Sequence, residues 1–381
     1  MKIKRFFQLV VLATLPLLMS CRGDDQEVIP SSMIQLQPPG TPSLIKGFYL
    51  LNEGNMGSNK SSIDYFDYTT GYYRRNMYAE VNPSVTMELG DVGNDIQVYG
   101  NKLYAVINVS GLVEVMDVAT ARHLATIKIP NCRYIVFNKG KAYVSSYAGP
   151  VSIDPNARLG YIAEIDTISL KVTNEVTVGY QPEEMVALNN KLYVANSGGY
   201  RVPNYDNTVS VIDLNTFTKT NDIEVAINLH RMKADAFGTI YVTSRGDYEN
   251  VASDIYMIDS STDKVTGSLG IAASELCICN DLLYLYGSDY NRATQETTIN
   301  YAVIDTRTKE IISHNFITDG TDKNIERPYG IAVNPETQEI LITDAKSYTL
   351  PGTLYCFTPE GKKKWSVTTG DIPAHFAFVY K

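Results

Sequence analysis

Lys191-Leu192-Tyr193-Val194-Ala195-Asn196, followed after a loop by Val209-Ser210-Val211-Ile212-Asp213, is the stretch that decides the fold. Both segments are rich in β-branched and aromatic residues and alternate in the way that half-buried strands do. A largely apolar run, residues 184–188, precedes them, and a second strand-like run, residues 219–225, follows a turn. The four segments together predict one antiparallel four-stranded unit.

The same unit returns along the chain at an almost constant spacing. Its third strand ends in Asp six times and in Thr once, and successive ends lie 46 to 53 residues apart. These ends are Asp67, Asp117, Asp166, Asp213, Asp259, Asp305 and Thr358. An anchor residue in the second strand repeats with the same count, at Tyr49, Tyr104, Tyr143, Tyr193, Tyr241, Tyr284 and Leu341. Seven copies are therefore present, and each Asp is expected to form a turn with its own backbone.

Four strands per unit, repeated at this length without a helical period, predict an all-β fold: a seven-bladed β-propeller with four antiparallel strands per blade. The propeller is expected over residues 47–381. It begins with a second strand, residues 48–51, and ends with a first strand that has no unit of its own, residues 376–380. We therefore expect the C-terminal strand to join blade one and to close the ring, which removes its open sheet edges.

The charge balance limits the partners of the protein. The chain has 33 basic and 42 acidic side chains, a net charge of −9. Nucleic acids and anionic lipid head groups require a basic surface, so we expect no nucleic-acid partner. The sequence also contains 27 Tyr but one Trp. Tyrosine suits half-buried strands and wet recognition surfaces, and this composition favours a globular β protein with a binding face.

The first 20 residues have the features of a secretory signal peptide. Lys2, Lys4 and Arg5 precede an apolar run, residues 6–19, which is too short to cross a bilayer comfortably. We therefore expect residues 1–20 to be removed from the exported protein.

The residues after the signal predict a lipid anchor. Ser20-Cys21 resembles a bacterial lipobox, in which the cysteine is lipidated, so Cys21 is the expected membrane anchor. Residues 21–46 are rich in Pro, Ser and Gln and are expected to form a flexible tether. Their acidic segment, residues 22–27, resembles the export signal that sends Bacteroides lipoproteins to the outer face of the outer membrane. The predicted location is therefore the cell surface.

Four further cysteines, Cys132, Cys277, Cys279 and Cys356, lie in apolar strand-like runs. No C-x-x-C pair occurs, so neither a zinc site nor a redox motif is indicated. We expect buried thiols, although a disulfide between Cys277 or Cys279 and a distant cysteine stays open.

The loops at one face of the predicted ring carry many polar and aromatic residues. In a blade the innermost strand starts, and the second strand ends, on the same face, so loops from all seven blades converge there. Flat aromatic area with amide and hydroxyl groups suits a large, polar-rimmed small molecule better than a charged polymer. The predicted ligand-binding residues are Asn52, Asn94, Asp95, Asn108, Arg133, Tyr134, Tyr147, Gln181, Asn196, Tyr200, His230, Arg231, Arg245, Tyr248, Tyr286, Tyr290, Arg327, Tyr329, Tyr348 and His375.

The Tyr-Val-x-Asn and Val-Ile-Asp pattern resembles the YVTN/YncE-like propellers over residues 47–381. With the lipobox, the acidic segment and the Tyr/Asn/Arg-rich face, the chain resembles the BtuG-type surface lipoproteins of gut Bacteroides. This resemblance implies capture of vitamin B12 (cobalamin) or related corrinoids at the outer membrane, and their transfer to a TonB-dependent, BtuB-type transporter. It assigns no individual contact residue, so the site residues above rest on loop geometry.

Motifs for chemistry are scarce. The sequence has no G-x-S-x-G, H-E-x-x-H, Walker or calcium-loop motif, so we expect a binding protein with no catalytic residue, no metal and no catalytic cofactor. Two other functions stay open: a structural or adhesive surface propeller, and a cation-dependent hydrolase resembling lactonase-type propellers. His230 and His375 could also hold cobalt or zinc. The hydrolase would use an oxygen ring of Glu53, Asn108, Asn196 and Asp344.

Overall fold

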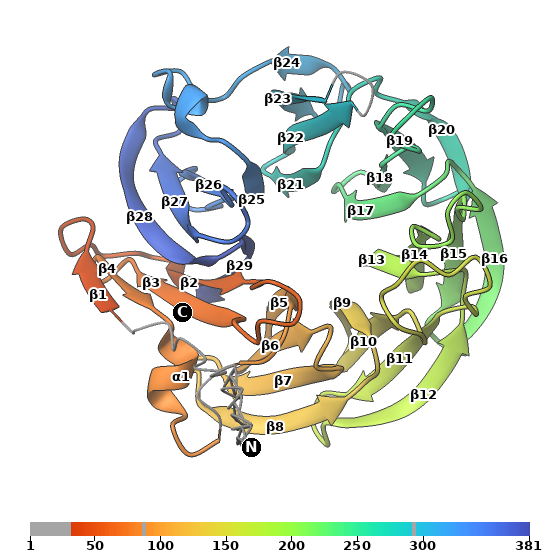
Figure 1. Ribbon diagram of the computed structural model, residues 1–381, viewed down its shortest axis with the longest axis horizontal. Helices are drawn as coiled ribbons and strands as arrows, with labels where there is room; N and C mark the ends of the chain where they lie inside the picture. The colour runs from red at the N-terminus through yellow and green to blue at the C-terminus, as the bar shows by residue number, and fades with distance from the viewer. Residues whose placement is uncertain (1–31, 86–88, 292–294) are drawn as a thin grey trace, which may run out of the picture.

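The computed structural model describes residues 32–85, 89–291 and 295–381. Seven β-sheets are arranged around a central axis like the blades of a propeller (Figure 1). Six of these sheets have four strands and the first has five, and neighbouring strands within each sheet are antiparallel. The predicted seven-bladed β-propeller is therefore confirmed.

Within each blade the strands follow one another from the central axis outward. Blade one contains β29 (Pro373–Tyr380), β2 (Ile45–Asn52), β3 (Ser62–Asp67), β4 (Tyr72–Arg75) and β1 (Ser32–Gln35). Blade two contains β5 (Gly93–Tyr99), β6 (Lys102–Ile107), β7 (Leu112–Asp117) and β8 (His123–Lys128). Blade three contains β9 (Cys132–Asn138), β10 (Lys141–Ser146), β11 (Tyr161–Asp166) and β12 (Lys171–Thr177).

The remaining blades follow the same order. Blade four contains β13 (Pro182–Leu188), β14 (Lys191–Asn196), β15 (Thr208–Asp213) and β16 (Thr218–Glu224), and blade five β17 (Leu229–Ala234), β18 (Thr239–Ser244), β19 (Asp254–Asp259) and β20 (Lys264–Ser268). Blade six contains β21 (Glu275–Cys279), β22 (Leu282–Asn291), β23 (Glu296–Asp305) and β24 (Ile311–Ser313), and blade seven β25 (Pro328–Val333), β26 (Ile340–Asp344), β27 (Pro351–Phe357) and β28 (Lys363–Asp371). Two short helices, α1 (Met77–Val81) and η1 (Thr321–Asn324), connect strands.

The repeated Asp ends the third strand of each of the first six blades, as predicted. Its carboxylate caps the following turn: the Asp213 carboxylate accepts the backbone N–H of Asn215 at 2.7 Å and of Thr216 at 3.1 Å. Asp305 makes the same pair of bonds with the next turn. A short polar side chain that bonds its own turn stabilises the hairpin locally. The role of these residues is structural.

The repeated second-strand tyrosine joins neighbouring blades. Tyr49, Tyr193 and Tyr241 are fully buried. The Tyr49 hydroxyl donates to the Val118 carbonyl in blade two at 2.8 Å, and the Tyr193 hydroxyl donates to Asp263 in blade five at 2.6 Å. Tyrosine therefore fills the space between blades with its ring and satisfies its buried hydroxyl across the interface. This repeated contact explains part of the high tyrosine content.

The ring closes through the two ends of the propeller domain. β29 pairs with β2 from Ile45 opposite Tyr380 to Asn52 opposite Pro373. Figure 1 shows β29, blue, beside β2, red, although they lie more than 300 residues apart. The predicted closure by the C-terminal strand is confirmed, and it leaves no inner strand of blade one unpaired.

The N-terminal segment differs from the expected tether in its described part. Residues Ser32–Gln35 form β1, which pairs with β4 and adds an outer strand to blade one. Further along, the Glu336 carboxylate accepts the backbone N–H groups of Leu44 and Ile45 at 3.0 and 2.7 Å. The Ile45 bond, followed by two bonds from Ser43 and the Leu44 bond, lowers the pKa of Glu336 to about 2. Residues 32–46 are thus attached to the propeller by bonds that the composition did not predict.

The predicted signal peptide, residues 1–20, and Cys21 lie outside the described residues. Within the described part of the chain, no helix is both long and apolar enough to cross a membrane.

Candidate functional site

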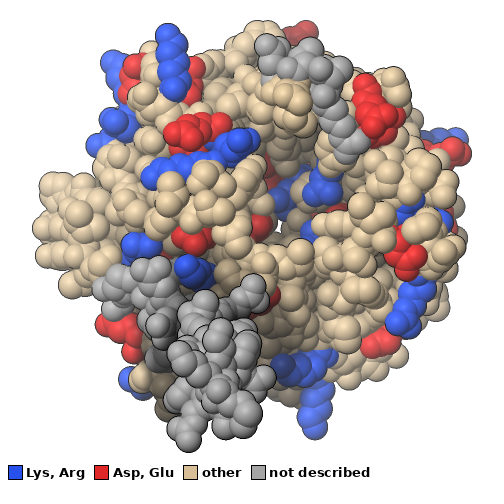
Figure 2. Space-filling model, viewed as in Figure 1, with Lys and Arg blue, Asp and Glu red and all other residues tan. Residues whose placement is uncertain are grey.

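The innermost strands of the seven blades surround the central axis (Figure 1), and the space-filling view shows a hollow there (Figure 2). We call its opening on the side where these strands start the mouth. Figure 2 shows lysine and arginine side chains, blue, in the wall around the hollow, while most of the surrounding surface is uncharged. The side chains that form the mouth come from strand starts and loops of several blades, so they are distant in sequence.

A repeated β-bulge decides which side chains reach the mouth. In blade five, Leu229 pairs with Ser244 and Met232 pairs with Val242, so His230 and Arg231 both stand opposite one residue. Similar register shifts occur near the starts of the innermost strands of blades one, two, three, four and seven, but β21 pairs regularly. A bulge re-aims side chains that would otherwise alternate between faces. Two consecutive residues of one strand can therefore line the hollow.

Glu183 holds the first group of charges at the mouth. Its buried carboxylate accepts hydrogen bonds from Arg133 Nη2 at 3.1 Å and from the Tyr147 hydroxyl at 2.5 Å. Arg245 Nη1 lies 3.8 Å from the same carboxylate, which is an ion pair beyond hydrogen-bond distance. Burial alone would raise the pKa of Glu183, but the two arginines outweigh burial and lower the pKa. Glu183 is therefore ionised and pairs with the cations at neutral pH.

Arg231, Tyr134 and His230 form a second hydrogen-bonded chain. Arg231 Nη1 donates to the Tyr134 hydroxyl at 2.6 Å, and this hydroxyl lies 3.1 Å from His230 Nε2. Arg231 Nε also pairs with Glu275 Oε2 at 2.7 Å. Burial, with Arg245 and Arg231 nearby, lowers the pKa of His230 well below its usual range. His230 is therefore neutral at pH 7, and its Nε2 accepts the hydrogen of the Tyr134 hydroxyl.

A third group lies across the hollow. The Tyr329 hydroxyl donates to Glu53 Oε2 at 2.8 Å, and His375 Nε2 lies 3.3 Å from Glu53 Oε1. The Tyr329 and Tyr348 rings meet edge to face with centroids 5.9 Å apart. Arg327 lies over the Tyr348 ring, 5.3 Å from its centroid. Aromatic and cation–π contacts of this kind keep large side chains in fixed positions.

Between these groups lies a cavity of about 230 Å³, which we call the mouth pocket. Hydroxyl groups, two guanidiniums and one imidazole supply its polar atoms. None of its described lining residues is Asp or Glu. The lining residues are His230, Arg231, Arg245, Tyr248, Ser253, Ala273, Ser274, Tyr286, Ser288, Pro328, Tyr329 and Tyr348.

A ring of exposed apolar side chains surrounds the mouth. In six blades the connection between the second and third strands carries at least one large exposed hydrophobic residue, and in blade six the exposed Tyr290 lies near the end of the second strand, β22. Single exposed apolar residues are common, but their recurrence on one face is typical of an interaction surface. We call this set the apolar rim: Met56, Val109, Ile153, Leu159, Val202, Tyr248, Val251, Tyr290, Tyr348 and Leu350.

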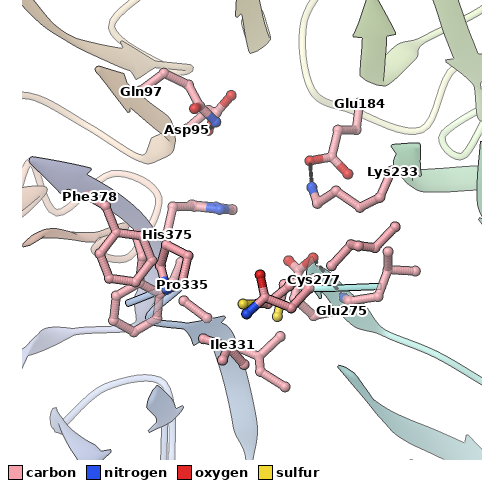
Figure 3. A pocket seen from close by; sticks show the side chains of 18 of the residues that line it. Asp95, Gln97, Glu184, Lys233, Glu275, Cys277, Ile331, Pro335, His375 and Phe378 are labelled. Atoms are coloured by element: carbon pink, nitrogen blue, oxygen red, sulfur yellow. Dashed lines mark hydrogen bonds and ion pairs between the residues drawn. The ribbon is translucent and has the colours of Figure 1, made fainter. Parts of the chain in front are cut away.

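Deeper in the hollow lies a second space of about 370 Å³, which we call the inner chamber (Figure 3). Figure 3 shows Lys233 reaching toward Glu184, to which its ammonium group is ion-paired. Asp95 lies across the chamber and accepts the backbone N–H of Ile135 at 3.0 Å. The described lining includes Asp95, Gln97, Glu184, Lys233, Glu275, Cys277, Ile331, His375, Phe376 and Phe378. Its carboxylates outnumber its one lysine, and the remaining wall is largely apolar.

Eleven of the predicted site residues meet at the mouth. Seven line the mouth pocket: His230, Arg231, Arg245, Tyr248, Tyr286, Tyr329 and Tyr348. Four contact one another or Glu53 and Glu183 in its wall: Arg133, Tyr134, Tyr147 and His375.

Three others lie further out. Tyr200 contacts the Tyr147 ring, Arg327 contacts Tyr348, and Tyr290 is exposed on the β22–β23 hairpin.

Six other predicted site residues do not line the mouth pocket, and one of them, Asp95, lines the inner chamber. Their side chains are buried and hold the backbone or neighbouring side chains in place. Asn108 Nδ2 donates to the Cys132 carbonyl at 2.9 Å, and Asn196 Nδ2 donates to the Ser210 hydroxyl at 3.0 Å. These amide nitrogens are therefore engaged within the fold. The six residues are Asn52, Asn94, Asp95, Asn108, Gln181 and Asn196.

The two carboxylates of the hydrolase alternative have protein partners. Asp344 accepts the backbone N–H groups of Arg327 and Lys346, each at 2.9 Å, and Glu53 accepts the Tyr329 hydroxyl at 2.8 Å. His230 and His375 each have another protein partner. Among the described residues, no group of three or more His, Cys, Asp or Glu side chains could hold a metal ion.

The four cysteines of the propeller are free thiols. Cys132, Cys279 and Cys356 are buried, whereas Cys277 is half-buried and lines the inner chamber. The expectation of buried thiols is confirmed for three of them, and the disulfide alternative is not observed.

Sequence reasoning missed the inner chamber and the serines of the mouth pocket. Glu184 directly follows Glu183 on the innermost strand β13, and Lys233 directly precedes Ala234 on β17. In a strand with strict alternation, only one of the adjacent side chains Glu183 and Glu184 would face the hollow. The bulge at the start of β13 lets both face it. Two adjacent acidic residues at the start of an apolar strand were the signal that could have indicated it.

Comparison with known proteins supports the fold and assigns the family. The sequence matches a domain of unknown function, DUF5074, over residues 46–378. No curated protein matches it. Solved structures with the same overall arrangement are remote in sequence, so their likeness concerns the fold alone.

Three of these structures illustrate the fold. A quinoprotein alcohol dehydrogenase-like protein from Bacteroides thetaiotaomicron has a TM-score of 0.59 and 14% identity, covering 87% of this chain and 78% of its own. Apo AztD from Citrobacter koseri has a TM-score of 0.54 and 13% identity, covering 89% and 99%. Hydrazine synthase from Kuenenia stuttgartiensis has a TM-score of 0.55 and 14% identity, covering 70% and 77%. Because the family description spans almost the whole propeller, the chain belongs to the DUF5074 family.

Proposed function

We propose that the protein is a lipid-anchored outer-membrane protein that binds a corrinoid across the mouth and passes it to a TonB-dependent transporter. The observation that carries the proposal is the mouth itself, where a Tyr- and Arg-lined pocket is encircled by exposed apolar and aromatic side chains. A corrinoid is a broad disc edged with amides, so it needs flat apolar contact at its centre and hydrogen-bond partners around its edge. The mouth supplies both kinds of group.

The size of the mouth pocket limits how such a ligand could sit. Pockets that enclose small molecules measure roughly 300 to 1,000 Å³. The mouth pocket is about 230 Å³ and cannot enclose a corrinoid. The ligand would therefore lie over the mouth with one substituent inserted, and its disc would rest on the apolar rim.

Two exposed tyrosines are the expected anchors. Tyr248 and Tyr348 line the mouth pocket and keep 41% and 39% of their surface accessible. Tyrosine offers a large, stiff contact area at a low entropic cost, and such residues commonly dominate binding free energies. By contrast, Tyr134 and Tyr147 are buried, with hydroxyls bonded to neighbours, and support the wall instead.

The apolar rim also suits a second protein. Its members come from every blade, so a partner that covers the mouth would contact the whole ring. A transporter that covers the mouth while the ligand is bound would enclose the ligand between two proteins. Lipidation at Cys21 would keep the propeller beside such a partner in the same membrane.

Calorimetry tests the proposal directly. Purified residues 22–381 would be titrated with cyanocobalamin, and the visible absorbance of the corrinoid would be followed in parallel. We expect saturable heat with one site per chain, and a shift of the absorbance bands. A protein that is folded by circular dichroism yet yields neither signal at micromolar concentration would refute corrinoid binding.

A further inference from the structure

The mouth pocket is cationic although the protein is acidic. The chain carries a net charge of −9. The pocket nevertheless has Arg231 and Arg245 in its lining and, among its described residues, no carboxylate. A fixed positive charge in a concave, partly desolvated site attracts anions more strongly than the same charge on a flat surface.

The nearby carboxylates lie behind the arginines and do not fill the pocket. Glu183 and Glu275 are buried, and Glu183 already accepts bonds from Arg133 and Tyr147. Glu183 and Glu275 pair with the guanidiniums of Arg133, Arg231 and Arg245, and Glu53 behind Tyr329 accepts the hydroxyl of that residue. These carboxylates belong to the wall, whereas the charged groups in the pocket lining itself are the two arginines.

Arg245 is the guanidinium best placed for a ligand. Its side chain is 31% exposed, compared with 13% for Arg133 and 8% for Arg231. Its ion pair with Glu183 is 3.8 Å long, so that pair uses none of its five N–H donors in a hydrogen bond. A planar guanidinium can bind two oxygens of a phosphate at once.

The rest of the pocket lining also suits an anion. Ser253, Ser274 and Ser288 contribute hydroxyl groups that can donate to an oxyanion, whereas Tyr286 and Tyr329 already donate theirs to the Tyr329 carbonyl and to Glu53. The volume of about 230 Å³ has room for a tetrahedral group with its ester substituents, but not for a corrin ring. Charge, donors and size therefore indicate one class of group.

We propose that the mouth pocket binds the phosphodiester of a nucleotide-bearing corrinoid, with Arg245 as its main contact. The inference rests on the proposed function for the identity of the ligand, but the anion site itself does not. It predicts a preference that corrin binding alone would not produce: complete corrinoids bind more tightly than cobinamide, which has the corrin ring and no phosphodiester.

The test measures the binding of two corrinoids to the wild type and to two variants. Wild type, Arg245→Gln and Arg307→Gln would each be titrated with cyanocobalamin and with dicyanocobinamide. Arg307 is the matched control, because it is an exposed arginine of the β23–β24 turn that pairs with Asp281, away from the mouth. We expect wild type and Arg307→Gln to prefer cyanocobalamin by about tenfold to a hundredfold, the range for hydrogen bonds to a charged group. Arg245→Gln should bind cyanocobalamin as weakly as cobinamide.

Inorganic phosphate separates this proposal from corrinoid binding. The unfolding midpoint of each variant would be measured in phosphate and in chloride at equal ionic strength. We expect phosphate to raise the midpoint of wild type and Arg307→Gln, and not that of Arg245→Gln.

The outcomes distinguish the two claims. Equal affinity of wild type for both corrinoids, or a preference that survives in Arg245→Gln, would overturn the anion site while corrinoid binding stands. Protection by phosphate without binding of either corrinoid would support the anion site and refute the corrinoid. A lack of both responses would refute both proposals.

Discussion

The mouth pocket and the inner chamber occupy the same hollow and share the same strands, yet they differ in charge. On β17, Arg231 lines the mouth pocket and Lys233, two residues later, lines the chamber. The described lining of the pocket contains cations without a carboxylate, whereas the chamber sets Asp95, Glu184 and Glu275 against a single lysine. The two ends of one hollow therefore present different charges to the space between them.

The difference lies in where the counter-ions stand. In the chamber, Glu184 lies inside the cavity and pairs with Lys233 there. At the mouth, Glu183 lies in the wall, so it neutralises the arginines from behind. A buried charge needs a partner, but the position of the partner decides whether the charge remains available to a ligand. We therefore expect the mouth to carry recognition and the chamber to carry none of it.

The largest effect is expected from Glu183→Gln. This substitution leaves Arg133 in a buried position with a neutral partner, and breaking one side of a buried ion pair typically costs about 3 to 5 kcal/mol. The free energy of unfolding, measured in urea, should fall by that amount. Glu175→Gln, on the exposed face of β12, is the control and should change stability by less than about 0.5 kcal/mol. Equal stability of the two variants would contradict the counter-ion role of Glu183.

A smaller effect, on binding alone, is expected from replacing Tyr248 and Tyr348 together with Ala. Both are exposed at the pocket, so their loss should weaken corrinoid binding by about 2 to 4 kcal/mol and leave the unfolding midpoint nearly unchanged. Phe237→Ala, an exposed aromatic at the β17–β18 turn, is the matched control. Calorimetry and thermal unfolding would measure the two quantities. A double variant that binds like wild type would remove these tyrosines from the site.

The smallest effect is on the pH dependence of folding stability, which should have opposite signs for the mouth residue Glu183 and the inner-chamber residue Asp95. The folded pKa of Glu183 lies below its ordinary 4.5, so its contribution to stability is present above pH 4.5 and is lost as the pH falls through the folded value. Burial raises the pKa of Asp95 in the folded protein above 3.8, because the ionised carboxylate is less stable there than in the unfolded chain. Stability is therefore lost as the pH rises through the folded pKa of Asp95.

Urea denaturation across this acid range would measure both slopes. Glu183→Gln should approach wild type as the pH falls, because both then lack the ionised carboxylate. Asp95→Asn should gain stability relative to wild type as the pH rises toward neutrality. One unit of pKa difference corresponds to about 1.4 kcal/mol, which sets the scale of each change. Slopes of the same sign for the two variants would contradict the contrast between pocket and chamber.

Much of the fold could be predicted because the repeat is local. The turn at Asp213 depends on residues close in sequence, whereas the anchor at Tyr193 bonds Asp263 in the next blade and was recognised because the tyrosine recurs at a constant spacing. The site was predicted less well. The loop rule located Arg245 and Tyr348 at the mouth, but it also selected Asn108 and Asn196, whose amides turn into the blade. A position at a strand end gives the face of the ring and does not give the direction of the side chain.

The number of blades, the strand order within each blade and the use of β29 to close the ring follow from the amino-acid pattern alone, because alternation and turn residues repeat at a constant spacing. Which charges face a ligand depends instead on the assembled ring. Tyr134 and His230 are 96 residues apart and meet because the ring brings their strand starts together. The bulges then turn consecutive side chains into the hollow, and their register depends on pairing with the second strand, which no single strand specifies.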